Sequence, residues 1–309
     1  MIKRSIMLLF CLGLPVYSQS KPATPKSAPT QAKSTRTATA LGPTALLESA
    51  RQSSAQGKYS EAITKLSSAL ELAPNSTELL FDYGVVGLRL GKPAETVRSM
   101  AAATRLEPDN PDYLYLLGVA QLWAGDKEAS IVPLARSAEL SPDSTRAQLA
   151  YGTALHSLHK YDDAAIPLER VLALDPSNPE ALFLLADIAT IKGDPARATR
   201  MSDRVLADDP KNPEANLIRG TVLADRGSYE EARRALEVAA SGDPDNPRIF
   251  SQLSRVYAQL GDNARAASAR NALERATRRS KQSQRQLHQL LDFSSSRSEP
   301  AAKNSATKP

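Results

Sequence analysis

Residues 179–212, PEALFLLADIATIKGDPARATRMSDRVLADDPKN, contain the pattern on which most of the chain is built. Apolar residues recur at helical spacing on both sides of Gly193, and Pro210 lies near the end of the stretch. We predict a first helix over about 180–192, ended by the left-handed backbone that glycine favours. A second helix follows over about 194–208 and stops there, because Pro210 cannot continue it. The stretch is therefore predicted to fold as a helical hairpin.

The same pattern recurs every 34 residues without insertion or deletion, which predicts a solenoid of stacked hairpins. The blocks are 43–76, 77–110, 111–144, 145–178, 179–212, 213–246 and 247–280. The register is defined by prolines Pro74, Pro108, Pro142, Pro176, Pro210 and Pro244, and by glycines Gly57, Gly91, Gly125, Gly193, Gly227 and Gly261, with His159 in the remaining glycine position.

Small residues recur at the same period in the middle of both helices. Since a large side chain there would hold the two helices apart, we expect these residues to face one another within each hairpin. On the first helices they are Gly84, Gly118, Gly152, Ala186 and Gly220, and on the second helices Thr96, Ser130, Ala164, Ala198 and Ala232. Pro133 and Pro167 lie inside second helices, where each removes one hydrogen bond and is expected to bend its helix.

This pattern resembles the tetratricopeptide repeat (TPR). In block 111–144 it is carried by Leu114, Leu117, Gly118, Ser130, Leu134, Ala138 and Pro142. The resemblance covers about residues 43–280 and implies an all-α, right-handed solenoid of about seven hairpins plus a C-terminal capping helix. The residues that depart from the pattern are Gln148, Ser202, Asn216, Arg219, Arg270 and Arg278. Because Arg278 replaces the last proline, we expect the final helix to continue past it.

The resemblance also implies that the first helices line a concave groove for an extended peptide or a helix of a partner protein. By position, the groove would contain Phe81, Val85, Leu88, Tyr115, Val119, Leu122, Trp123, Leu149 and Phe183. Exposed apolar and aromatic residues of this kind often dominate a binding site. The alternative is that these side chains are partly buried between neighbouring hairpins. Further along, the corresponding positions are polar: Asp187, Thr221, Asp225, Arg255 and Gln259.

The two ends of the chain differ in composition from the repeats. Residues 1–18 have a basic start and a short apolar run, as in a secretory signal peptide, and they contain the only cysteine, Cys11. We predict cleavage near Ser18 and a periplasmic or secreted protein; an uncleaved membrane anchor is the alternative. Residues 19–41 are predicted to be a disordered linker, 281–293 a capping helix and 294–309 a disordered tail. The capping segment could instead dock on a membrane surface.

Charge is segregated along the chain. The net charge is +5, yet acidic residues outnumber basic ones between residues 42 and 263, so the basic excess lies in the terminal segments. Nucleic-acid binding is not expected, because the C-terminal arginines lack interleaved aromatic residues. The basic tails could contact a membrane or an anionic envelope polymer peripherally.

No catalytic constellation, phosphate-binding glycine cluster or cofactor motif is present in the sequence. His156 and His159 have the spacing of two metal ligands on one helical turn, but no third ligand can be assigned, so we predict no metal site. The sequence thus predicts an exported, non-catalytic scaffold that binds a protein or peptide from the cell envelope. The alternative is a structural envelope component tethered through its basic tails.

Overall fold

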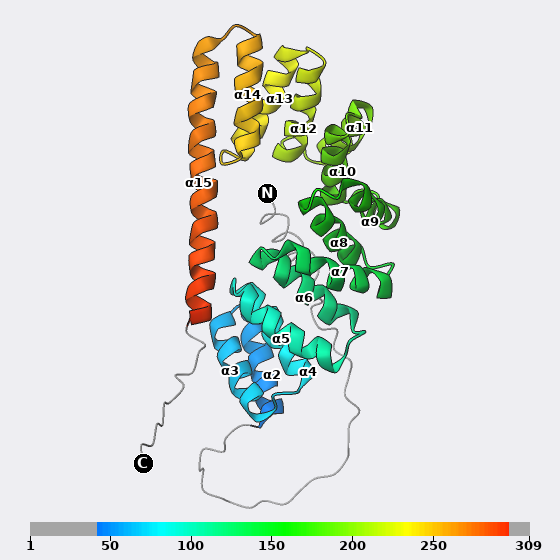
Figure 1. The fold of residues 1–309 in the computed structure, drawn as a ribbon, viewed down its shortest axis with the longest axis vertical. Coiled ribbons are helices and arrows are strands. Elements are labelled where there is room, and N and C mark those ends of the chain that lie inside the picture. Colours follow the sequence, from blue (N-terminus) through cyan, green and yellow to red (C-terminus); the bar gives the residue numbers. More distant parts are fainter. Residues whose placement is uncertain (1–41, 297–309) are drawn as a thin grey trace, which may run out of the picture. The chain divides into compact units, whose positions relative to one another are not determined.

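The computed structural model describes the backbone of residues 42–296 and the side chains of residues 42–279. Within that range the chain is all-α, with fourteen helices in consecutive hairpins and no strand (Figure 1). The helices are α2 (Pro43–Ala55), α3 (Tyr59–Leu72), α4 (Thr77–Arg89), α5 (Pro93–Leu106), α6 (Pro111–Ala124), α7 (Lys127–Leu140), α8 (Thr145–Ser157), α9 (Tyr161–Leu174), α10 (Pro179–Ile191), α11 (Pro195–Asp208), α12 (Pro213–Asp225), α13 (Tyr229–Gly242), α14 (Pro247–Gln259) and α15 (Asn263–Ser296).

The chain divides into two compact units that meet within α8. Among the described residues, the N-terminal unit comprises residues 42–154 and the C-terminal unit residues 155–296. None of the described helices is both long enough and apolar enough to cross a membrane. The predicted signal peptide and linker lie outside the described residues, as does the tail beyond residue 296.

The turns inside the hairpins confirm the glycine register. All six glycines that define the register have positive φ, between 69° and 95°. His159 takes their place in the fourth hairpin with φ 60°, a left-handed conformation that histidine tolerates better than most side chains do. The following first helices begin at asparagine caps in several blocks; Asn178, for example, accepts a hydrogen bond from the Ala181 amide at 3.0 Å.

The small residues bring the two helices of a hairpin into close contact, as predicted. A Cβ added to Gly118 would lie 2.5 Å from Leu134 Cγ and 3.1 Å from the Ser130 carbonyl oxygen. At Gly220 it would lie 2.6 Å from Leu236 Cγ. These distances leave no room for a side chain: each glycine is opposed by a leucine side chain and by the backbone carbonyl of the small residue, rather than by the small side chain itself.

Two departures from the repeat pattern have a structural explanation. Gln148 and Asn216 take the place of a large apolar residue early in α8 and α12, and both are buried. Gln148 Nε2 donates to the Ala138 carbonyl at 3.0 Å, and Asn216 Nδ2 donates to the Pro210 carbonyl at 3.1 Å. Each amide therefore ties its helix to the end of the preceding hairpin, because a buried amide must find hydrogen-bond partners.

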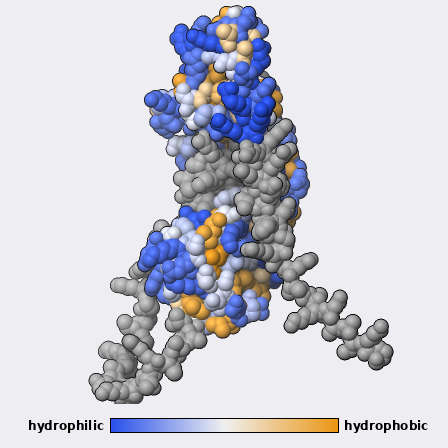
Figure 2. Space-filling model, turned by 90° about the vertical axis from the view of Figure 1, so that its left-hand side faces the viewer, coloured by the Kyte–Doolittle hydropathy of each residue, from blue (hydrophilic) through white to orange (hydrophobic). Residues whose placement is uncertain are grey.

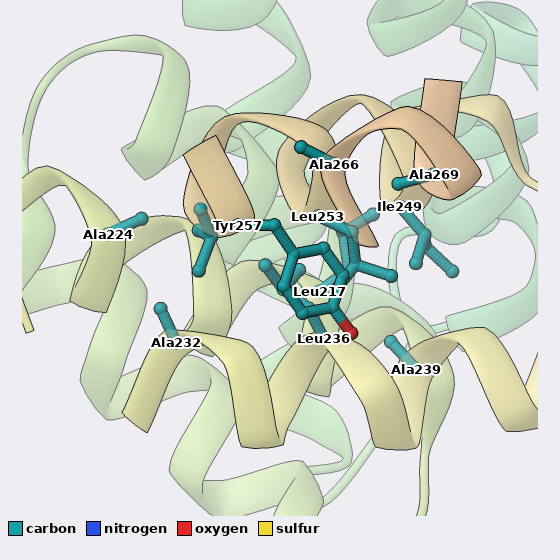
Figure 3. Packing of buried hydrophobic residues seen from close by; sticks show 11 residues of the cluster. Leu217, Ala224, Ala232, Leu236, Ala239, Ile249, Leu253, Tyr257, Ala266 and Ala269 are labelled. Atoms are coloured by element: carbon teal, nitrogen blue, oxygen red, sulfur yellow. The ribbon is translucent and has the colours of Figure 1, made fainter. Parts of the chain in front are cut away.

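The core of the C-terminal unit extends to the last hairpin. Leu217, Leu236, Ile249 and Leu253 pack together from α12, α13 and α14 (Figure 3). Small residues of α15 close the same cluster: Ala266 and Ala269. The last helix continues past Arg278, as expected, and includes the predicted capping segment 281–293. The side chains of that segment lie outside the described residues, so what they cover stays a prediction.

Second helices α7 and α9 continue through their internal prolines. Pro133 and Pro167 are both buried, and each helix spans 14 residues around its proline. The residue before each proline is instead highly exposed: Val132 is 75% exposed and Ile166 is 71% exposed.

On the side of the molecule that Figure 2 draws, apolar residues form separate patches in a mostly hydrophilic surface.

Candidate protein-binding face

The first helices of successive hairpins contact one another within each unit, which creates a first-helix face. In the N-terminal unit it is formed by α2, α4 and α6, and Arg146 at the start of α8 is joined to α6 through Asp112; in the C-terminal unit it is formed by α10, α12 and α14. Eight of the nine predicted groove residues belong to the N-terminal unit, and only Phe183 belongs to the C-terminal unit.

The predicted groove residues divide into two groups by burial. Those that are buried are Leu88, Tyr115, Val119, Leu122 and Leu149. Those that stay partly exposed are Phe81, Val85, Trp123 and Phe183. The buried group offers little surface to a ligand and forms a layer beneath the face. Contact with a partner in the N-terminal unit would therefore concentrate on Phe81 and Val85 of α4 and Trp123 of α6.

Two aromatic contacts shape this part of the face. The rings of Phe81 and Tyr113 are 5.5 Å apart at a tilt of 40°, which joins α4 to α6. The guanidinium of Arg146 lies 4.6 Å above the ring of Tyr115 and also pairs with Asp112 at 2.5 Å. We did not predict Tyr113 or Arg146 as site residues. The available signal was periodicity, since Arg146 and Asp112 occupy equivalent positions 34 residues apart.

An ion-pair cluster joins α2 to α4 on the same face. Arg51 donates to Asp82 at 2.6 Å and to Glu78 at 2.7 Å. Burial raises the pKa of Asp82, and the opposing hydrogen bond and charge of Arg51 do not fully offset it. The N-terminal unit thus places a partly exposed apolar area beside charged pairs, a combination typical of protein-binding surfaces.

The first-helix face of the C-terminal unit is polar at the positions predicted to be polar. Arg255 pairs with Asp225 at 2.7 Å, and Thr221 Oγ1 donates to the Leu217 carbonyl of its own helix. Asp187 is almost fully buried and accepts from His156 Nε2 at 3.0 Å and from Arg248 Nη2 at 2.6 Å. Burial opposes ionisation of Asp187. The hydrogen bond from His156 and the charge and hydrogen bond of Arg248 outweigh this effect, and the pKa of Asp187 lies below its usual value.

The two closely spaced histidines face different partners. His156 Nε2 faces Asp187, whereas His159 Nδ1 lies 2.7 Å from the Tyr161 hydroxyl. Across the described side chains, no group of three His, Cys, Asp or Glu residues could hold a metal ion. The two histidines of the HxxH motif therefore each make a hydrogen bond to a different side chain.

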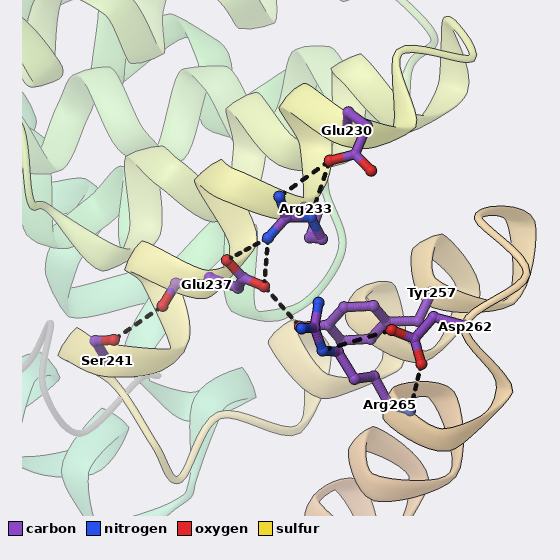
Figure 4. A network of polar contacts seen from close by, with 7 residues as sticks. All are labelled: Glu230, Arg233, Glu237, Ser241, Tyr257, Asp262 and Arg265. Carbon is purple, nitrogen blue, oxygen red and sulfur yellow. Dashed lines mark hydrogen bonds and ion pairs between the residues drawn. The ribbon is translucent and has the colours of Figure 1, made fainter.

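A second polar network joins the last two hairpins (Figure 4). Arg233 makes two hydrogen bonds of 2.9 Å to Glu237, which in turn accepts from the Tyr257 hydroxyl at 2.8 Å. Burial, followed by the adjacent Glu237 carboxylate, raises the pKa of Tyr257 to about 12. The network links α13 to α14. An open hollow of about 160 Å³ lies nearby, lined by Phe250, Leu253, Tyr257, Arg265, Ser268, Ala269 and Ala272.

Comparison with known families identifies the repeat. One model of the tetratricopeptide repeat matches residues 47–97, 88–145 and 134–179, and another matches 223–291. A model described as anaphase-promoting complex, cyclosome, subunit 3 matches residues 157–239. Because the tetratricopeptide models together span more than half of the chain, the chain belongs to the tetratricopeptide repeat family.

Solved structures show the same fold at low sequence identity. A tetratricopeptide repeat protein from Parabacteroides merdae has a TM-score of 0.63 at 17% identity, over 81% of this chain and 97% of that chain. YrrB, a TPR protein with an unusual peptide-binding site, has a TM-score of 0.51 at 22% identity, over 55% and 88%. MamA protein has a TM-score of 0.51 at 22% identity, over 55% and 92%. No curated protein matches the sequence.

Proposed function

We propose that this protein is an exported scaffold that binds an apolar segment of an envelope protein on the first-helix face of its N-terminal unit. Tetratricopeptide repeat proteins are in general non-catalytic scaffolds for protein interactions. The observation that carries the finer proposal is the partly exposed set Phe81, Val85 and Trp123, on two contacting helices above a buried apolar layer. YrrB, which shares the fold, is described as having a peptide-binding site.

The binding face is tested with peptides selected from a random display library on the full-length protein. Titration calorimetry then compares wild type with Trp123→Ala and Phe81→Ala. Because aromatic anchors dominate affinity, each substitution is expected to weaken binding at least 10-fold. Val132→Ala is the matched control, since Val132 is a highly exposed apolar residue on a second helix of the same unit. Selected peptides that bind Trp123→Ala and Phe81→Ala as tightly as wild type would contradict the proposal.

Trp123 gives an independent signal because it is the only tryptophan of the chain. Binding next to its ring is expected to shift its fluorescence emission, and the shift should saturate at the dissociation constant measured by calorimetry. A ligand that binds without any change in emission would place the site elsewhere.

Export is a separate part of the proposal and is supported by the composition of residues 1–18. Mass spectrometry of the protein from its native host is expected to find Gln19 at the N-terminus and the protein in the envelope fraction. A chain that retains Met1 and fractionates with the cytoplasm would contradict export and leave the binding face untouched.

The second candidate function, tethering through basic tails, is favoured by the segregation of positive charge to the termini. Its test must spare the last hairpin, since Ala266, Ala269 and Ala276 of α15 are buried. Deleting residues 19–41 or 297–309 is expected to release the protein from the envelope only if the tails hold it there. Peptide binding by the deletion variants distinguishes tethering from the scaffold function.

A further inference from the structure

Several departures from the repeat pattern meet in one place in the C-terminal unit. His159 stands where every other hairpin has glycine, and it is the only non-glycine residue with positive φ in the described chain. It contacts the Tyr161 hydroxyl, and the Tyr161 ring in turn packs edge-on against His156 at 5.5 Å. His156 Nε2 is hydrogen-bonded to the Asp187 carboxylate, which also accepts a hydrogen bond from Arg248. A hairpin solenoid needs none of these side chains in order to fold, so their convergence calls for another explanation.

The central group is Asp187, whose side chain is only 4% exposed. Its two partners come from different hairpins: His156 lies at the end of α8, and Arg248 lies at the start of α14. Arg248 and Asp187 are 61 residues apart, so their bond passes over the whole hairpin formed by α12 and α13. Most other ion pairs between hairpins in this chain join residues 27 to 34 apart, that is, in neighbouring blocks.

A link that skips a hairpin has a mechanical consequence. In a solenoid each repeat contacts mainly its neighbours, so small rotations between neighbours add up and the curvature is set loosely. A direct bond from the fifth hairpin to the seventh restrains two of these rotations at once. The bond is also strong for its kind, because the carboxylate is buried and receives charge-assisted hydrogen bonds from both sides.

Arg248 is the part of this cluster that can leave. Its side chain is 46% exposed, so it can be hydrated when it separates from Asp187. Asp187 would then keep only the hydrogen bond to His156 Nε2 and would favour recapture of Arg248, because a buried carboxylate is costly without a cation. The pairing of Arg248 with Asp187 is therefore favoured, and Arg248 is the partner that water could stabilise if the two separate.

We propose that Arg248, Asp187 and His156 form a clasp that holds the first-helix face of the C-terminal unit in its closed curvature. Closing the clasp brings α14 toward α10, and opening it lets the sixth and seventh hairpins swing away from the fifth. The clasp thus sets the width of the polar first-helix face in this unit. This inference does not depend on the proposed binding face of the N-terminal unit.

The test measures the distance across the clasp by electron–electron double resonance. Spin labels are attached at Asp163→Cys on α9 and Arg270→Cys on α15, two exposed positions of this unit, in full-length protein carrying Cys11→Ser. Arg248→Ala is expected to lengthen the mean distance and to broaden its distribution. Asp187→Asn should do the same, and Arg248→Lys should lie between wild type and Arg248→Ala.

The matched control is Arg219→Ala. Arg219 is a half-exposed arginine of α12 in the same unit, with only a 3.9 Å contact to Asp203, so its removal should leave the distance unchanged. If Asp187→Asn disrupts folding, Arg248→Ala still decides the matter, because it removes a largely surface side chain. An unchanged distance distribution in folded Arg248→Ala would overturn the clasp, and so would an equal change in Arg219→Ala.

Discussion

The two units of this chain are built from the same hairpin but present different first-helix faces. In the N-terminal unit Phe81, Val85 and Trp123 form a partly exposed apolar area beside the ion pairs of Arg51. In the C-terminal unit the positions equivalent to Val85 hold the buried Asp187 and the exposed Arg255, which pair with Arg248 and Asp225, and Phe183 is the one predicted groove residue that stays partly exposed. The register of glycine, proline and small residues runs through both units, with His159 in one glycine position and Arg278 in the last proline position. The comparison shows that this register determines the hairpin, while the first-helix face is free to change chemistry from block to block.

The largest expected effect tests whether the two units also unfold separately. Leu116→Ala and Leu236→Ala each remove a fully buried leucine, one per unit, at an expected cost of about 2–5 kcal/mol. Trp123 lies in the N-terminal unit, so its fluorescence reports that unit alone, whereas far-ultraviolet circular dichroism reports both. In urea, Leu116→Ala should lower the midpoint of the fluorescence transition.

Leu236→Ala should leave that fluorescence midpoint in place and lower only a part of the circular-dichroism transition. This separation is expected because stability in a solenoid is a sum of local terms. If Leu236→Ala instead lowered the fluorescence midpoint as much as Leu116→Ala does, the two units would form one cooperative block. The comparison between them would then be one of surface chemistry only.

A smaller effect is expected where helices approach closely in the N-terminal unit. The Cβ of Gly118→Ala would collide with Leu134 Cγ in the helix opposite, so we expect a loss of about 1–3 kcal/mol. At Gly84 the closest atom is Met100 Cε, 2.9 Å away at the flexible end of its side chain. Gly84→Ala is therefore the milder, matched variant. If Gly118→Ala and Gly84→Ala lowered the urea midpoint of Trp123 fluorescence equally, the rigidity of the opposing side chain would not determine the loss of stability.

Much of the fold could be predicted because the repeat places equivalent residues at a constant spacing. The register located every positive-φ turn, including the one at His159, and the small residues that let the helices approach. Periodicity also indicated which groove positions change from apolar to polar. All these features depend on a position within one hairpin, which a spacing of 34 residues defines completely.

Features that depend on side chains crossing between hairpins could not be predicted. The bond between Arg248 and Asp187 joins positions 61 residues apart, which is not a multiple of the repeat. Burial of Tyr115 beneath Arg146 depends on the reach of an arginine from the next hairpin. The division of the groove into buried and partly exposed residues has the same origin, since it is set by neighbours that a single block does not reveal.

Asp187 in the C-terminal unit and Asp82 in the N-terminal unit should respond to acid in opposite directions. The pKa of Asp187 is lowered, so its contribution is present at neutral pH and is lost as pH falls through the folded-state pKa, below about 4. The pKa of Asp82 is raised, so its folded form gains relative stability as pH falls and loses it as pH rises through that raised pKa. Asp187→Asn should therefore reduce the loss of stability of the C-terminal unit as pH falls.

Asp82→Asn should remove the stability that the N-terminal unit gains from this group as pH falls toward the unfolded-state pKa of about 3.9, measured by Trp123 fluorescence in urea. The two variants serve as controls for each other, because each changes one buried aspartate beside an arginine. A C-terminal unit whose acid sensitivity is the same in wild type and Asp187→Asn would mean that the clasp carboxylate is not the group that titrates.

The smallest effect concerns a feature that the two units share. Tyr257 donates to Glu237 in the C-terminal unit, and Tyr83 donates to Glu95 at 3.1 Å in the N-terminal unit. Burial, then the neighbouring carboxylate, raises the pKa of both hydroxyls, that of Tyr257 to about 12. The stabilisation that each hydroxyl supplies is fully present below its unfolded-state pKa of about 10, and it is lost as pH rises through its folded-state pKa.

Tyr257→Phe removes one hydrogen bond to a charged group and is expected to cost about 1 kcal/mol at neutral pH. It should also flatten the loss of stability of the C-terminal unit between pH 10 and about 12, measured by circular dichroism in urea. Tyr83→Phe should do the same for the N-terminal unit, measured by Trp123 fluorescence. Both units must therefore lose stability in alkali, whereas their aspartates respond to acid with opposite signs. If Tyr257→Phe left the alkaline slope of its unit unchanged, titration of Tyr257 would not be what destabilises the unit in alkali.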